Sequence, residues 1–236
     1  QLLTPATLVR WNLDKRYLRD LAAAGTEVVP TRYVLAGETL TLGEIMGTAS
    51  WDEVVFKPVV SAAAHLTYRV DRRTLAAHEA LFARCVAAEA MMVQPFQSIV
   101  LGEGELSLIV IEGRATHAVR KTAAPGDFRV QDDHGGRVHR HRPTDDECSF
   151  AEAAVAACPS QPLYARVDFV RNPEGGFRLM ELELIEPELF FRFHPPAAQA
   201  LAAALERRLT HPEPDLGMRP RTQRSQIAPG QDVTRA

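Results

Sequence analysis

The chain has 236 residues, of which 46% are hydrophobic, and a formal net charge of −3. This size can bury one large core or two small ones, and the near-neutral charge argues against nucleic-acid binding as the main role. The sequence shows no run of about 18 apolar residues to span a membrane and no signal peptide. We therefore predict a cytoplasmic protein that binds neither nucleic acid nor a membrane, with its three cysteines as reduced thiols.

The first half of the chain is predicted to alternate short helices and strands. Leu13, Tyr17 and Leu21 fall at helical spacing within residues 8–24, and Gly25 is typical of a helix stop. The β-branched run VVFKPVV predicts a buried strand. The elements expected here are helices over 8–24, 40–46 and 75–90, and strands over 54–60, 66–70 and 91–96.

The second half is predicted to begin with strands and to end on a helix. Thr144 and Glu147 form a capping-box pattern at the start of one helix, and the composition after Thr210 shifts to Pro, Arg, Gln and Gly. The elements expected here are strands over 105–112, 115–121 and 137–141, helices over 145–157 and 195–209, and a flexible tail over 212–236.

The stretch Tyr164–Pro187, YARVDFVRNPEGGFRLMELELIEP, predicts two strands joined by a turn at NPEGG. Because side chains alternate between the two faces of a strand, Arg166 and Asp168 share one face. Glu181 and Glu183 share a face of the return strand by the same argument. If the strands pair, three carboxylates and a guanidinium lie on one surface above an apolar back.

Such a carboxylate-rich surface has two interpretations. It is either the solvated face of an amphipathic hairpin, or a site at which a divalent cation relieves the repulsion between the carboxylates. Mg²⁺ prefers oxygen ligands and is usually held by one or two carboxylates together with substrate phosphates. Three glutamates within the six residues ELELIE, separated by apolar residues, favour the cation site.

The motifs RVDF and MELELIEP resemble the carboxy-terminal half of the ATP-grasp ligases, a family that includes D-alanine–D-alanine ligase, glutathione synthetase and the ribosomal-protein glutamate ligases. The resemblance implies that Asp168, Glu181 and Glu183 hold one or two Mg²⁺ ions that clamp ATP, with Mn²⁺ as a substitute ion. Glu183 stands where many relatives have Asn, which leaves the number of ions open. The resemblance also implies that Arg166 stabilises negative charge on the reacting acyl group.

Three earlier motifs, WNLDKRY, VVFKP and MMVQPF, resemble the nucleotide site of the same family. The resemblance implies that Lys15 and Lys57 contact the phosphates of ATP and that Ser61 begins a phosphate loop, SAAA, over residues 61–64. It also implies that Gln94 and Phe96 line the adenine site. Taken without the resemblance, the lysines are solvated side chains, the loop is an ordinary turn, and the last motif is a plain edge strand.

Two basic residues of the second half, Lys121 at the end of the strand over 115–121 and Arg129 after it, resemble the acceptor side of glutathione-synthetase-like ligases. The resemblance implies that they pair with a carboxylate or an acyl phosphate. With the metal carboxylates, they complete the predicted catalytic machinery. We expect Asp168→Asn to cut turnover at least about tenfold and to leave the fold intact.

The resemblance implies an α+β ATP-grasp fold, in which two α/β subdomains with antiparallel sheets grip ATP between them. We expect residues 1–93 to form the N-terminal part, with the nucleotide lysines and the phosphate loop, and residues 94–211 to form the C-terminal subdomain, with the Mg²⁺ site. The further domain that precedes these motifs in relatives is expected to be largely absent from this chain.

The activity implied by the resemblance is ATP- and Mg²⁺-dependent ligation of a carboxylate to an amine through an acyl phosphate, on an amino-acid-like or small peptide-like substrate. The segments ARVDFVR and LMELELIEPELFF are most similar to the actinobacterial branch with the cycloserine-forming cyclo-ligase, which closes a ring in O-ureidoserine. The sequence leaves a homo-oligomer open. Two alternatives also stay open: a non-catalytic nucleotide- or metal-binding module, and an ATP-grasp phosphotransferase acting on a hydroxyl.

Overall fold

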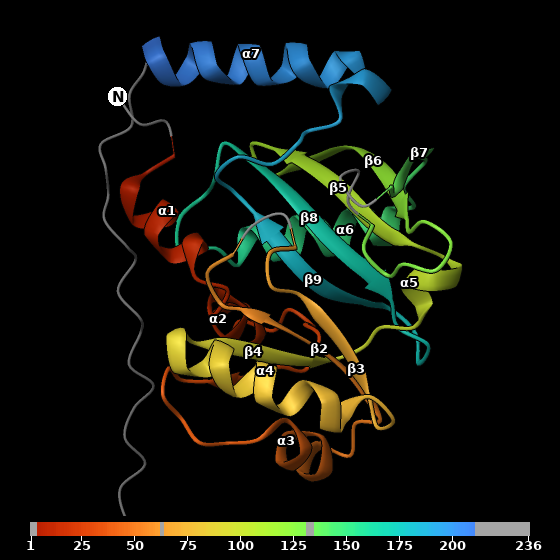
Figure 1. The fold of residues 1–236 in the computed structure, drawn as a ribbon. Coiled ribbons are helices and arrows are strands. Elements are labelled where there is room, and N and C mark those ends of the chain that lie inside the picture. The colour runs from red at the N-terminus through yellow and green to blue at the C-terminus, as the bar shows by residue number, and fades with distance from the viewer. Residues whose placement is uncertain (1–3, 62–63, 131–134, 211–236) are drawn as a thin grey trace, which may run out of the picture.

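The computed structural model describes residues 4–61, 64–130 and 135–210. Within them, the chain forms two antiparallel sheets, each covered by helices (Figure 1). The predicted α+β class is therefore confirmed. The predicted tail over 212–236, and Ala62 and Ala63 of the predicted phosphate loop, lie outside the described residues.

The smaller sheet has four strands in the order β1-β4-β2-β3. Its elements are β1 (Arg32–Val34), β2 (Glu53–Pro58), β3 (Tyr68–Asp71) and β4 (Met91–Pro95), with helices α3 (Leu42–Ala49) and α4 (Leu75–Ala88). Val54 and Phe56 of β2 are fully buried in a core with both helices. The alternate residues of this strand, Val55 and Lys57, line a cavity on the other face of the sheet.

The larger sheet has five strands in the order β7-β6-β5-β8-β9. Its strands are β5 (Glu105–Ile111), β6 (Arg114–Thr122), β7 (Arg137–His141), β8 (Tyr164–Arg171) and β9 (Phe177–Glu183). The remaining elements are α5 (Ile99–Gly102), α6 (Asp145–Ala156), the 3₁₀-helix η2 (Phe191–Phe193) and α7 (Pro195–Thr210). Every residue of the central strand β5 is buried, because α6 packs on one face of the sheet while α7 and η2 cover part of the other.

The predicted hairpin of Tyr164–Pro187 is confirmed, since β8 pairs antiparallel with β9. Asp168 lies opposite Glu181, and Arg166 lies opposite Glu183. Val167 and Leu182 face the opposite way and are buried in the core of the larger sheet. The pairing therefore places three carboxylates and a guanidinium on one surface, as the alternation of the sequence predicts.

The single helix predicted over residues 8–24 is wrong, because the chain forms α1 (Ala6–Leu13) and α2 (Tyr17–Ala23) with a break between them. At the break, the backbone N–H of Lys15 donates to the carbonyl of Val59, 2.8 Å away, instead of continuing the helix. The Asp14 carboxylate accepts from the backbone N–H of Arg16 at 2.9 Å, which stabilises the turn locally. The break directs Lys15 toward the loop that follows β2.

The first two helices pack in a core that both sheets share, since their cluster also contains Tyr33 of β1 and Met92 of β4. Leu8, Leu18 and Leu21 belong to the same buried cluster as the strands of the larger sheet. The boundary near residue 93 between two subdomains stays a prediction. Among the described residues, no helix is long and apolar enough to cross a membrane, and the three cysteines are free thiols.

Candidate active site

A cavity of about 620 Å³ is lined by residues of both sheets. The structure brings every residue of the predicted site to this one cavity: Lys15, Lys57, Ser61, Gln94, Phe96, Lys121, Arg129, Arg166, Asp168, Glu181 and Glu183. Their shared location is consistent with the predicted roles, each of which stays a prediction.

Asp168 lies at the centre of the carboxylate surface and is only 3% exposed. It accepts hydrogen bonds from Ser107 Oγ at 2.5 Å and from Arg166 Nε at 3.0 Å, and forms an ion pair with Lys121 Nζ at 3.1 Å. Burial by itself would raise the pKa of Asp168, but the cations of Arg166 and Lys121 hold it well below its usual range. Asp168 is therefore ionised at neutral pH.

The two glutamates of β9 differ in their surroundings. Glu181 lies 3.3 Å from Lys15 Nζ, and although burial opposes ionisation, Lys57 and Lys15 together lower its pKa. Glu183 forms an ion pair with Arg166. Burial, followed by repulsion from Asp168, nevertheless raises the pKa of Glu183 to about 7.

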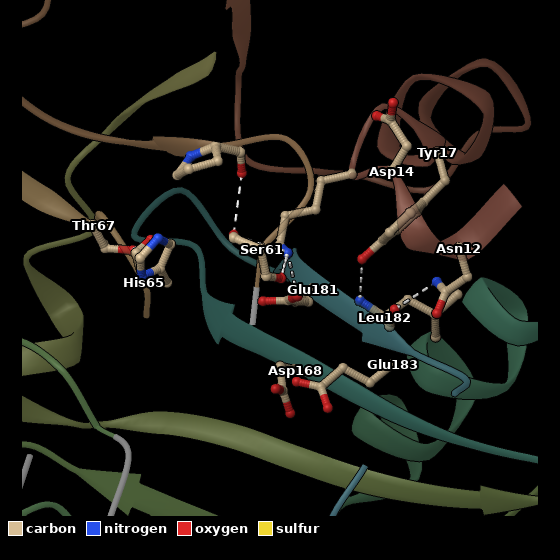
Figure 2. A network of polar contacts seen from close by, with 12 residues as sticks. Asn12, Asp14, Tyr17, Ser61, His65, Thr67, Asp168, Glu181, Leu182 and Glu183 are labelled. Carbon is tan, nitrogen blue, oxygen red and sulfur yellow. Dashed lines mark hydrogen bonds and ion pairs between the residues drawn. The ribbon is translucent and has the colours of Figure 1, made fainter. Parts of the chain in front are cut away.

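Lys15 is held at the cavity by both its backbone and its side chain. Its Nζ donates to the carbonyl of Ser61 at 2.5 Å and lies 3.3 Å from the carboxylate of Glu181; Ser61 and Glu181 are both labelled in Figure 2. The helix break described above thus brings the amine to the loop after β2. This ammonium group lies between the carboxylates and the predicted phosphate loop.

Lys121 lies beneath the carboxylates and is 6% exposed. Its Nζ is 2.5 Å from Glu105 and 3.1 Å from Asp168, so its charge is already shared between two buried carboxylates. The predicted role of Lys121 toward an acceptor stays a prediction. Glu105 and Ser107 were not predicted as site residues, although two polar side chains on one face of the apolar strand ELSLIVI were a usable signal.

The other end of the cavity is more apolar. The ring of Phe96 stacks with the guanidinium of Arg69, 3.9 Å from its centroid, and meets Phe128 edge-on at 6.0 Å between centroids. Gln94, 4% exposed, donates its side-chain Nε2 to Thr31 at 2.9 Å. A flat aromatic surface beside a buried amide offers a place for a planar base.

Arg129 also lines this end of the cavity, but it is already paired. Its guanidinium contacts the Asp127 carboxylate at 2.7 Å. An acceptor carboxylate would have to compete with Asp127 for this guanidinium. The role predicted for Arg129 is untested.

The carboxylate oxygens are of the type that Mg²⁺ prefers, and one or two of them suffice when phosphates supply the other ligands. In the described residues, however, no group of three His, Cys, Asp or Glu side chains is gathered closely enough to hold a metal ion. Cations of the protein contact these carboxylates instead, since Lys15 pairs with Glu181 while Arg166 pairs with both Asp168 and Glu183. The donor set fits Mg²⁺ if these cations shift toward phosphates.

Comparison with known proteins supports the resemblance to the ATP-grasp ligases. No family model matches the chain. Cycloserine biosynthesis protein DcsG of Streptomyces lavendulae is 34% identical over 227 residues, which cover 89% of this chain and 74% of that protein. The crystal structure of D-cycloserine synthetase DcsG has a TM-score of 0.80 at 31% identity and covers the same shares, 89% and 74%.

More distant structures share the fold alone. D-alanine–D-alanine ligase from Bacillus anthracis has a TM-score of 0.66 at 16% identity, covering 88% of this chain and 69% of that one. The ATP-grasp ligase PsnB, in complex with a phosphomimetic precursor variant, Mg and ADP, has a TM-score of 0.62 at 18% identity, covering 86% and 61%.

The chain belongs to the ATP-grasp ligase superfamily. Within this superfamily it lies near the cycloserine synthetase branch. The predicted fold and the predicted class of enzyme are thus confirmed.

Proposed function

We propose that the chain is an ATP- and Mg²⁺-dependent carboxylate–amine ligase that acts on an amino-acid-like small molecule and closes a ring, as in cycloserine formation. The observation that carries the proposal is the paired register of Asp168 and Glu181, which face Lys15 and Lys57 in one cavity. Oxygen ligands for a cation and ammonium groups for phosphates thus line the same space.

Two lysines supply the positive charge for the triphosphate. Lys57 projects from β2 of the smaller sheet, and Lys15 reaches the cavity from the break between α1 and α2. Ser61, which accepts from Lys15, begins the loop beside them. Catalysis in such a site rests on positioning and on charge neutralisation.

The reaction needs no protein nucleophile. A carboxylate oxygen of the substrate attacks the γ-phosphorus of ATP, the bond to the β,γ-bridging oxygen breaks, and ADP leaves. The substrate amine then attacks the acyl carbon, the carbon–oxygen bond to phosphate breaks, and the nitrogen loses a proton. Arg166, whose side chain is 12% exposed among the carboxylates, stabilises the negative charge that develops on the acyl oxygen.

The residues that would hold Mg²⁺ are Asp168, Glu181 and Glu183. When bound, Mg²⁺ supplies charge neutralisation at the phosphate oxygens. The role of the protein is to orient these carboxylates from two paired strands, which are more rigid than loops. The apolar end of the cavity, with Phe96 and Phe128, takes the adenine.

Hydroxylamine trapping tests the acyl phosphate directly. The protein is incubated with Mg²⁺, ATP and hydroxylamine in the presence of either O-ureido-D-serine or a set of ordinary amino acids. The expected result is a hydroxamate that forms only when a carboxylate substrate is present, together with an equal amount of ADP. A phosphorylated hydroxyl without hydroxamate would contradict the proposal and indicate a phosphotransferase instead.

A further inference from the structure

Among the described residues, no strand pairs with the outer edge of β9, yet backbone groups at two points of this edge, Leu179 and Leu182, are hydrogen-bonded. At one end, the N–H of Val29 donates to the carbonyl of Leu179 at 3.0 Å, and the N–H of Leu179 donates to the carbonyl of Glu27 at 2.9 Å. Beyond this point, side chains rather than backbone complete the edge. An open edge of this kind would otherwise expose unpaired donors and acceptors.

Asn12 and Tyr17 provide the side-chain contacts. Asn12 Nδ2 donates to the carbonyl of Leu182 at 2.8 Å, and Asn12 Oδ1 accepts from the N–H of Leu184 at 3.0 Å. The N–H of Leu182 donates to the hydroxyl of Tyr17 at 2.8 Å. The side-chain amide of Asn12 therefore imitates the backbone of a paired strand.

These contacts fall beside the carboxylates predicted to hold the metal. Leu182 lies between Glu181 and Glu183 in the strand. Both glutamate side chains project from the face opposite to that of the Leu182 side chain, so holding the backbone of Leu182 also fixes their direction. Asn12 is 8% exposed and Tyr17 is 3% exposed, so neither contact competes with bulk water. Burial, reinforced by the nearby Glu181 carboxylate, raises the pKa of Tyr17 well above its ordinary value, and the hydroxyl stays protonated.

The same short stretch carries Lys15. This residue lies between Asn12 and Tyr17 in the chain, and its amine is 3.3 Å from Glu181. Figure 2 shows Asn12 and Tyr17 reaching the strand at Leu182, with Glu181 and Glu183 on either side of it. One segment thus delivers an ammonium group to the cavity and holds the strand that presents the carboxylates.

We infer that Asn12 and Tyr17 are positioning residues that set the spacing between Lys15 and the carboxylates of Glu181 and Glu183, and so couple phosphate binding to metal binding. The inference rests on the proposed function. It differs from a merely structural role because the contacts of Asn12 and Tyr17 with this edge fall on Leu182 and Leu184, directly beside the glutamates. Nothing in the spacing of the sequence identifies Asn12, since its contacts are with residues about 170 positions away.

The test measures how much Mg²⁺ strengthens ATP binding to the whole chain, by calorimetry with Mg²⁺ and with EDTA. The variants are Asn12→Ala and Tyr17→Phe. Their matched controls are Asn172→Ala, an asparagine that is also 8% exposed but bonds Glu27 at the far end of the hairpin, and Tyr68→Phe, on the smaller sheet. Hydrogen exchange at the amides of Leu182 and Leu184 reports whether the edge has loosened.

In Asn12→Ala and in Tyr17→Phe, the factor by which Mg²⁺ strengthens ATP binding is expected to be at least about tenfold smaller than in the wild type. Losses of this size are typical when outer-shell partners of a metal site are changed. The two controls keep that gain even where their melting temperatures fall equally. The inference is overturned if the two variants lose thermal stability but keep the full gain. A wild-type chain that shows no Mg²⁺-dependent gain would overturn the proposed function itself, and this inference with it.

Discussion

Lys15→Met tests the idea that protein cations occupy the metal carboxylates before the metal arrives. Lys15 Nζ lies 3.3 Å from Glu181, and its side chain is 8% exposed. At an effective dielectric constant of about 20, a pair at this distance attracts by about 5 kcal/mol before the cost of desolvation is subtracted. A metal ion that binds Glu181 must overcome the net part of this attraction, unless ATP offers the lysine a phosphate instead.

The substitution should therefore move two affinities in opposite directions. Without nucleotide, Mn²⁺ should bind Lys15→Met at least about tenfold more tightly, because Glu181 has lost its competing cation. Without metal, ATP should bind about ten- to a hundredfold more weakly, because a hydrogen bond from a charged donor contributes about 1.5–3 kcal/mol.

The assay is calorimetric titration of Mn²⁺ alone and of ATP in EDTA. Arg16→Met is the matched control, since Arg16 is the adjacent residue, 45% exposed, and pairs with Asp14. In Arg16→Met, the affinities for Mn²⁺ alone and for ATP in EDTA should both equal those of the wild type. If Lys15→Met weakens both affinities or leaves Mn²⁺ binding unaltered, the reasoning is refuted.

Two further predictions follow from the buried charges. Asp168→Asn should lower the free energy of unfolding by about 3–5 kcal/mol in denaturant titrations, because it leaves Arg166 and Lys121 buried with less negative charge beside them. This revises the sequence-based expectation of an intact fold. A loss below about 1 kcal/mol would contradict the burial argument. Because the pKa of Glu183 is raised to about 7, a metal that binds its ionised form must displace a proton below that pH. Mn²⁺ affinity should thus fall about tenfold from pH 8 to pH 6 in wild type but not in Glu183→Gln, and an equal fall in both would exclude Glu183 as the titrating group. Because the pKa of Glu183 is higher in the folded chain than its ordinary value, the folded state holds this proton more tightly than the unfolded state does. Protonated Glu183 therefore stabilises the metal-free fold at acidic pH, and this contribution is lost as the pH rises through about 7.

The hairpin of β8 and β9 could be predicted because its information is local. The alternation of polar and apolar residues fixes which side chains share a face, and the turn residues fix where the chain reverses. The capping box of Thr144 and Glu147, also local, is present at the start of α6. These features need no knowledge of distant contacts.

The break between α1 and α2 could not be predicted in this way. The helical spacing of Leu13, Tyr17 and Leu21 runs through it without interruption. The helix ends because the backbone of Lys15 bonds to Val59, 44 positions further along the sequence, and because the chain turns locally at Asp14. A tertiary contact thus overrides a local preference.

The partners of Lys121 were hidden for a similar reason. The sequence shows a basic residue near the end of a strand, and only the sheet order brings Glu105 and Asp168 against it. The domain boundaries, the cytoplasmic location and a homo-oligomer stay predictions.

The most direct test of the central claim is phosphate release from ATP by the full-length protein. It is measured with and without Mg²⁺, against pools of amino acids and related acids, one of which contains O-ureido-D-serine. The account predicts release that requires both Mg²⁺ and a carboxylate substrate, strongest in the pool with O-ureido-D-serine. An absence of release from every pool, with Mg²⁺–ATP binding confirmed by calorimetry, would contradict a ligase and indicate a nucleotide-binding module.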